Sequence, residues 1–156
     1  MNKPEFVYVS FIASTPEKVW EALTSPEFTR QYWGGLRITS DWQVGSPVKH
    51  LTEDGRAGWE GEVLQFDPPH VLSYTFHMLI GEAYIRERPS RVTFTVEPWE
   101  SVVKLTLVHD NAEPGSVTLE NTRNGWPAIM SSLKSLLETD HALPFSRLGF
   151  GPRDRQ

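Results

Sequence analysis

The feature that most constrains the fold is a change in the period of the apolar residues along the chain. Three successive runs alternate apolar and polar side chains, as strands with one buried face do. Their apolar members are Leu72, Tyr74, Phe76 and Met78, then Val92, Phe94 and Val96, then Val103, Leu105 and Leu107. Further on the period lengthens to that of a helix, with Ile129, Leu133, Leu136 and Leu137 on one face. An antiparallel sheet followed by one long helix on its apolar face predicts an α+β domain.

Other strands precede these three. Residues 36–42, 48–52 and 59–66 have strand patterns, and Asp54-Gly55 is a strong hairpin signal between the last two. Gly61, inside a strand, indicates a bulge or a close approach of another backbone. With a first strand over residues 6–11, which is β-branched and aromatic, the curved sheet has about six or seven strands.

Two short helices are predicted after the first strand. Thr15 is a good N-cap and Pro16 suits the first helical position. Ser25-Pro26 repeats that signal for a helix that continues to about Tyr32. Trp33-Gly34-Gly35 ends it, because paired glycines supply backbone freedom that other residues lack.

Pro127 predicts where the long C-terminal helix begins. An interior proline removes a backbone hydrogen bond, so Pro127 is expected only near the start of the helix. Residues 115–124 are open to two interpretations, a loop or an additional helical segment kinked at Gly125.

The composition excludes several classes of protein. The length of 156 residues fits a single domain over 1–156, with a core at about 6–139 and a tail over 141–156. The absence of cysteine excludes disulfides and thiolate chemistry. A net charge of -5 without a basic run argues against nucleic acid as a partner, and no apolar run reaches the ~20 residues of a membrane span. Because no signal-peptide pattern precedes the first strand, the cytoplasm is the expected location.

Short pieces of sequence, taken in order, carry a family resemblance. They are STPEKVWEALTSPEFTRQYWGG, DWQVGSPV, GEVLQFDPPHVLSYTF, SRVTFTVEP, VKLTLVHDN and NGWPAIMSSLKSLLE. Together they resemble the domain family named after the activator of heat-shock protein 90 ATPase, within the START and birch-pollen-allergen superfamily (SRPBCC). The resemblance implies the helix-grip fold, in which a curved antiparallel sheet wraps around a long C-terminal helix. It also implies a choice of functions: carriage of small apolar molecules, contact with a chaperone in the stress response, or enzymatic activity.

Side chains suited to chemistry form no recognisable motif. The five histidines lack the spacing of a metal site, and no serine nucleophile elbow is present, so no catalytic residue, metal or cofactor is expected. His50 and His109 are in phase with inward-facing positions and are predicted to point into the interior. They are either hydrogen-bonded core histidines or polar groups of a pocket. Glu60 and Glu62 are either paired carboxylates or, as the simpler interpretation, a solvated strand face. Arg88 or Arg91 either gates or binds an acidic group of a ligand or, more simply, belongs to exposed ion pairs.

A pocket between sheet and helix is subject to an energetic limit. At about 24 cal/mol per Å³, an empty apolar cavity of ~300 Å³ would cost on the order of 7 kcal/mol, and whole domains are stable by only about 5–15 kcal/mol. Such a pocket is therefore occupied, lined by polar groups and wet, or plugged by aromatic side chains, for which Trp20, Trp33 and others are available. The predicted lining is Val48, His50, Trp59, Leu72, Tyr74, Phe76, Phe94, Leu105, His109, Trp126, Met130 and Leu133.

These features lead to a first hypothesis, a non-catalytic domain that binds a small hydrophobic or amphipathic molecule between the sheet and the C-terminal helix. The alternative is a co-chaperone-like domain with a protein partner, using an apolar patch at Phe145, Leu148 and Phe150 in the tail. An enzyme of the same superfamily is a third possibility, which requires two histidines and a carboxylate to converge on one cavity.

Overall fold

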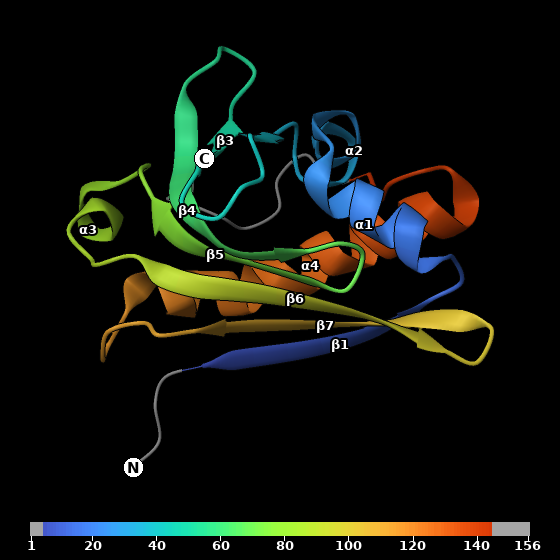
Figure 1. Cartoon of the computed structure of the whole chain (residues 1–156). Helices are drawn as coiled ribbons and strands as arrows, with labels where there is room; N and C mark the ends of the chain where they lie inside the picture. Colours follow the sequence, from blue (N-terminus) through green and yellow to red (C-terminus); the bar gives the residue numbers. More distant parts are fainter. Residues whose placement is uncertain (1–4, 145–156) are drawn as a thin grey trace.

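The computed structural model describes residues 5–144, which form one antiparallel sheet and four helices (Figure 1). In chain order the elements are β1 (Phe6–Ile12), α1 (Pro16–Thr24), α2 (Pro26–Tyr32), β2 (Arg37–Ser40), β3 (Pro47–Leu51), β4 (Ala57–Asp67), β5 (Val71–Met78), α3 (Glu82–Ile85), β6 (Ser90–Trp99), β7 (Val102–Asp110) and α4 (Val117–Thr139).

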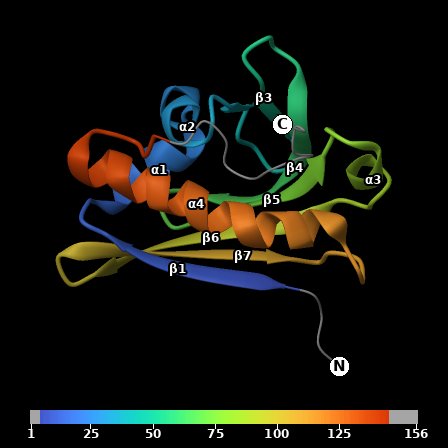
Figure 2. The same cartoon turned by 180° about the vertical axis from the view of Figure 1, so that it is seen from behind.

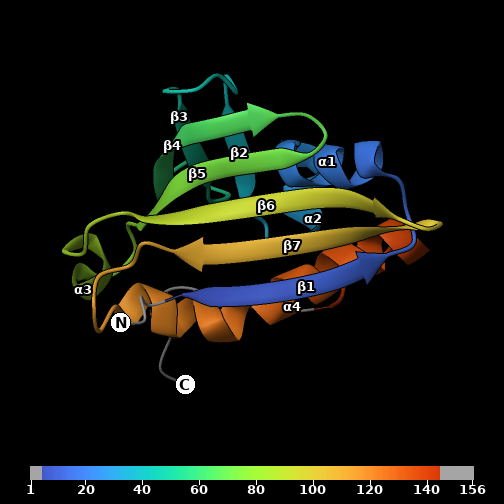
Figure 3. The same ribbon diagram turned by 60° about the horizontal axis from the view of Figure 1, so that its bottom comes forward.

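The sheet has seven strands in the order β1-β7-β6-β5-β4-β3-β2, and every neighbouring pair is antiparallel. Strands β2 to β7 follow one another as a meander, and β1 is added beside β7. Helix α4 runs along one face, with α1 and α2 next to it (Figures 1 and 2). Seen from the opposite side, the described part of the sheet carries no helix over β1, β7 and β6 (Figure 3). The predicted helix-grip α+β fold is therefore confirmed.

The two short helices are confirmed, including their first residues. The Thr15 hydroxyl accepts a hydrogen bond from the Lys18 N–H at 3.2 Å, and Pro16 and Pro26 open the two helices. Helix α2 is tied to its surroundings by two buried hydrogen bonds. The Tyr32 hydroxyl donates to the Ala22 carbonyl at 2.9 Å, and the Thr29 hydroxyl accepts from the Ile38 N–H at 3.0 Å.

The predicted start of the long helix is wrong. Helix α4 begins at Val117, so Pro127 lies inside it and the segment before Pro127 is helical. Ser116 caps the helix by accepting a hydrogen bond from the Leu119 N–H at 3.0 Å. No helix within residues 5–144 combines the length and the apolar character that crossing a membrane requires.

A contact from a distant part of the chain explains this early start. The Glu87 carboxylate, which precedes β6, accepts hydrogen bonds from the Val117 N–H at 2.6 Å, the Thr118 N–H at 3.3 Å and the Ser116 hydroxyl at 2.9 Å. These bonds satisfy backbone donors that a helix N-terminus leaves without partners, and a negative charge there also complements the helix dipole. The same bonds hold the pKa of Glu87 below its ordinary value although partial burial opposes that shift. This anchor stabilises the first turns and offsets the loss of one interior hydrogen bond at Pro127.

The interpretation of Gly61 is confirmed as a close backbone approach. A Cβ atom at this position would lie 1.7 Å from the carbonyl oxygen of Thr75 on β5. The Thr75 hydroxyl also accepts a hydrogen bond from the Glu62 N–H at 2.9 Å, and the register of β4 against β5 shifts just beyond, between Val63 and Gln65. Any side chain at residue 61 must therefore push the two strands apart.

We predict that Gly61→Ala lowers the free energy of unfolding by about 3 kcal/mol or more, because the clash is with backbone that has nowhere to move. Gly45→Ala is the matched control. Gly45 has φ +93 and open space around its Cβ position, so that substitution should cost only about 1 kcal/mol of backbone strain. Urea unfolding of both variants measures the difference, and equal losses would contradict the steric explanation.

Candidate functional site

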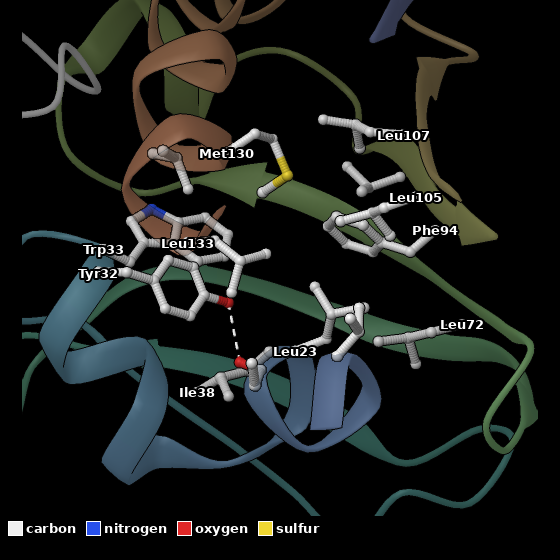
Figure 4. Close-up of a cluster of buried hydrophobic side chains, with 14 of the residues drawn as sticks. Leu23, Tyr32, Trp33, Ile38, Leu72, Phe94, Leu105, Leu107, Met130 and Leu133 are labelled. Atoms are coloured by element: carbon white, nitrogen blue, oxygen red, sulfur yellow. Dashed lines mark hydrogen bonds between the residues drawn. The ribbon is translucent and has the colours of Figure 1, made fainter. Parts of the chain in front are cut away.

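The residues predicted to line a pocket all lie in the interior, each with 4% or less of its surface exposed. They come from the inward-facing positions of β3 to β7 and from the sheet-facing side of α4. Figure 4 shows part of this layer, with Met130 and Leu133 of α4 facing Leu72, Phe94 and Leu105 of the sheet. Strand alternation therefore predicts the inward position of the members that lie on β3 to β7, and helical spacing that of the members on α4.

These side chains pack against one another in the interior. The Trp126 ring lies 5.3 Å from Trp33, 5.8 Å from Phe76 and 6.1 Å from Phe94, measured between ring centroids. The sequence predicts Trp33 only as one of the aromatics available to line or plug a pocket, and the structure places it in the interior with 2% of its surface exposed. Among the surface hollows of the described residues, three of about 320–350 Å³ include none of the predicted lining residues.

His109, on β7, is a fully partnered buried histidine. Its Nδ1 accepts a hydrogen bond from the Trp126 indole N–H at 2.9 Å, and its Nε2 lies 2.7 Å from the Ser90 hydroxyl oxygen. An indole N–H can only donate, so Nδ1 carries no proton and the proton of the neutral ring is on Nε2. Nε2 then donates to Ser90, whose own proton goes to the Phe76 carbonyl oxygen at 3.2 Å. This imidazole joins α4 to the sheet.

His50, on β3, is equally buried but has a different environment. It is 1% exposed, and neither ring nitrogen has a hydrogen-bond partner among the residues that the structure describes. Aromatic rings surround it: Trp33 at 4.8 Å, Tyr74 at 5.9 Å, Phe76 at 6.2 Å and Trp59 at 6.4 Å between centroids. We call these four rings the aromatic cage of His50.

Burial determines the protonation of both histidines. Loss of solvation lowers the pKa of His50 to about 3. The same effect lowers the pKa of His109 to about 4, although the Asp110 carboxylate acts in the opposite direction. Both rings are therefore neutral near pH 7. A buried polar group without a partner costs about 1–3 kcal/mol, a penalty that His109 avoids and His50 does not.

The position of Trp33 against His50 follows from how α2 ends. Trp33 is the C-cap residue of α2, and its N–H still bonds to the Thr29 carbonyl at 2.8 Å. Gly34 and Gly35 then take φ values of +59 and +87, a region that favours glycine, and they turn the chain into β2. The ring closest to His50 is thus carried by the end of a short helix, next to two residues with unusual backbone freedom.

The other polar residues considered from sequence do not join this site. Arg91 forms an ion pair with Asp110, with Arg91 Nε 2.8 Å from Asp110 Oδ1, in line with the exposed pairing expected for it. Glu60 is paired across the sheet with Lys49 and His77 on neighbouring strands, and Glu62 is exposed. No cluster of three potential metal ligands occurs within residues 5–144. The apolar patch predicted at Phe145, Leu148 and Phe150 lies outside the described residues.

A long helix held against one face of a seven-stranded antiparallel sheet, with two short helices after the first strand, defines a helix-grip domain. The chain belongs to the family described as "Activator of Hsp90 ATPase homolog 1-like protein", whose model matches residues 13–138. This confirms the resemblance drawn from the ordered sequence pieces. No curated protein sequence matches the chain at a significant level.

Solved structures with the same fold come from several organisms. The protein MLL2253 from Mesorhizobium loti has a TM-score of 0.73 at 26% identity, covering 86% of this chain and 97% of that one. The Aha1 dimer from Colwellia psychrerythraea has a TM-score of 0.70 at 20% identity, covering 87% and 97%. PFC0360w, an HSP90 activator from Plasmodium falciparum, has a TM-score of 0.63 at 22% identity, covering 78% and 86%. The last two likenesses concern the fold alone.

The contrast between the two histidines predicts opposite effects of the same substitution. His50→Phe should leave the free energy of unfolding unchanged or raise it by up to about 2 kcal/mol, because it replaces an unpartnered imidazole with an apolar ring of similar shape. His109→Phe should lower it by about 2–4 kcal/mol, because it leaves the Trp126 N–H without an acceptor inside the core. Urea unfolding near neutral pH measures both. If His50→Phe is as destabilising as His109→Phe, His50 has a structural role.

The pH dependence of the free energy of unfolding should also change in His50→Phe. Both histidines have folded pKa values below the ordinary 6.5. Their contribution to the free energy of unfolding is therefore complete above pH 6.5, and it is lost as the pH falls from 6.5 toward about 4 for His109 and about 3 for His50. In this window each histidine lowers the free energy of unfolding by up to about 1.4 kcal/mol per pH unit. Above about pH 5 the carboxylates with lowered pKa, such as Glu87 and Glu138, remain ionised and contribute little. Urea unfolding between pH 6.5 and about 5 should show a slope about half as steep in His50→Phe. An unaltered slope would mean that His50 is not neutral in the fold.

Proposed function

We propose that this chain is a binding domain for a small amphipathic molecule, which occupies the interior between the sheet and α4 and is recognised at its polar end by His50. The observation that carries the proposal is the buried imidazole of His50, which has no hydrogen-bond partner among the described residues. The fold supplies partners to a second imidazole in the same layer, since His109 bonds to both Ser90 and Trp126. A polar group left without a partner in such an interior needs an explanation, and a bound molecule is one.

The surroundings of His50 support binding rather than catalysis. The Phe76 ring lies between the two histidines, 6.2 Å from His50 and 5.2 Å from His109. The nearby carboxylate, Asp110, is held by Arg91 in an ion pair. The described residues therefore do not bring two histidines and a carboxylate to one cavity, which the enzyme hypothesis required.

Room for the guest would come from the Trp33 ring. It lies closest to His50, and the glycine pair that follows it can adopt other backbone angles. An outward movement of Trp33 exposes the imidazole and leaves a space with aromatic walls. The guest then occupies the space that the ring leaves, so the bound state contains no empty cavity and does not carry the cavity penalty.

A second candidate, a protein-interaction role, is favoured by a different observation. The outer face of the sheet carries an apolar stripe of Val7, Val9 and Phe11 on β1 and Trp99 on β6, which are 43–50% exposed. The rings of Phe11 and Trp99 lie 5.7 Å apart. The family name and the solved HSP90 activator of similar fold point to protein partners. The two functions use opposite faces of the sheet, so substitutions at Val9 and at His50 separate them.

The binding proposal predicts that neutral one- and two-ring organic molecules enter the interior. Met78 lies opposite Trp59 in the register of β4 and β5, and Met130 lies one turn after Trp126 on α4; they are 0% and 1% exposed, so their methyl NMR signals report an interior guest. Titration to about 1 mM should shift these signals for several members of such a set. Exposed methyl groups, such as those of Val44, should not move. If no member of the set shifts the interior methyl signals, the binding proposal is wrong.

A further inference from the structure

We propose that the His50 site selects an uncharged, flat aromatic molecule of one or two rings that carries a hydrogen-bond donor, a hydroxyl or a ring N–H. This inference rests on the proposed binding function and specifies its ligand class. Three properties of the site lead to it: the charge of the interior, the chemistry of the free imidazole, and the shape of the space next to it.

The charge of the interior excludes ionic guests. Burial keeps both histidines neutral, and it raises the pKa of Tyr32 and Tyr74 so that both phenols stay protonated. No charged group contributes to the lowered pKa of His50, whose only cause is loss of solvation. A carboxylate or ammonium guest would lie in this apolar space without a counter-charge, which costs several kcal/mol. The guest is therefore neutral.

The imidazole itself specifies the polar group. A neutral ring has one N–H donor and one bare nitrogen that accepts. The histidine of the same layer shows how this fold satisfies such a ring: an indole N–H donates to its bare nitrogen at 2.9 Å, and a hydroxyl meets the other nitrogen at 2.7 Å. A hydroxyl or a ring N–H on the guest would supply to His50 the partner that Trp126 supplies to His109. A carbonyl or ether, which only accepts, would meet the imidazole N–H but leave the bare nitrogen without a donor, whereas a hydroxyl both donates and accepts and can meet either nitrogen.

The space next to His50 specifies the shape. The Trp33 ring fills it, with its centroid 4.8 Å from His50 and 5.3 Å from Trp126. A molecule that replaces this ring meets the rings of His50, Trp126 and Tyr32, whose centroids lie 4.8, 5.3 and 6.2 Å from that of Trp33. Flat rings retain edge-to-face contacts with such walls, which are worth about 0.5–1.5 kcal/mol for each pair. A guest of about the size of an indole, or smaller, therefore fits best.

The test compares matched molecules that differ in the donor alone: phenol against toluene, and indole against 1-methylindole. Their affinities are measured from the methyl NMR signals of Met78 and Met130 in wild type, His50→Leu and His50→Phe. A surface control is His70→Leu, because His70 is exposed. An apolar interior without a donor-specific partner favours toluene and 1-methylindole, since these molecules leave water more readily.

In wild type and His70→Leu we expect phenol to bind about tenfold more tightly than toluene, and indole about tenfold more tightly than 1-methylindole, the effect of one hydrogen bond. In both His50 variants the ratio should fall to about one or invert. Benzoate, which is anionic, should not shift the interior signals. If toluene binds wild type as tightly as phenol, or if the ratio survives in the His50 variants, the ligand class is wrong while the binding function stands. If none of the four molecules reaches the interior, the proposed function itself fails.

Discussion

The hydrogen bond between the Trp126 indole and His109 Nδ1 is the contact on which the interior depends. It is a buried link, 2.9 Å long, between the helix and the sheet that the fold must hold together. The bond determines which nitrogen of His109 carries the proton, and that proton in turn fixes the Ser90 hydroxyl against the Phe76 carbonyl. It also holds the Trp126 ring where it contacts Trp33, Phe76 and Phe94. The position of α4 along the sheet and the packing of the aromatic layer are thus set together.

The environment of His50 differs from that of His109 in the same core, because no described residue bonds to its ring nitrogens. A sequence selected for stability alone would place an apolar residue at this position, because His50 forms no bond that would offset its desolvation. Proteins retain such features mainly where activity needs them, at some loss of stability. His109 is the natural comparison. Both histidines are buried in the same core, and they differ in whether hydrogen-bond partners lie within reach.

Much of the fold could be predicted from periodicity, and the failures were of one kind. Alternation placed Val48, His50, Leu105 and His109 on the inner face because the side chains of a strand alternate without exception along a regular ladder. Pro127 misled the prediction because a local rule was applied to a helix whose start depends on Glu87, 30 residues away from Val117 in sequence. The difference between His50 and His109 could not be predicted either. It depends on whether Ser90 and Trp126, from other elements, come within hydrogen-bond distance.

The filled interior also determines how such a domain can bind. Removing the Trp33 ring from the core costs about 3 kcal/mol or more once the space it leaves is included, so the open form is present at about 1% or less. A population this small lowers the apparent affinity of every guest about a hundredfold or more. A purely apolar guest restores the ring contacts that Trp33 gives up, but it leaves the imidazole as it was. A guest with a donor restores those contacts and also supplies a partner to the bare nitrogen of His50, so its occupied state is better satisfied than the closed one. A guest must therefore bind better than the Trp33 ring that it displaces, and the hydrogen bond to His50 gives a donor-bearing guest that advantage.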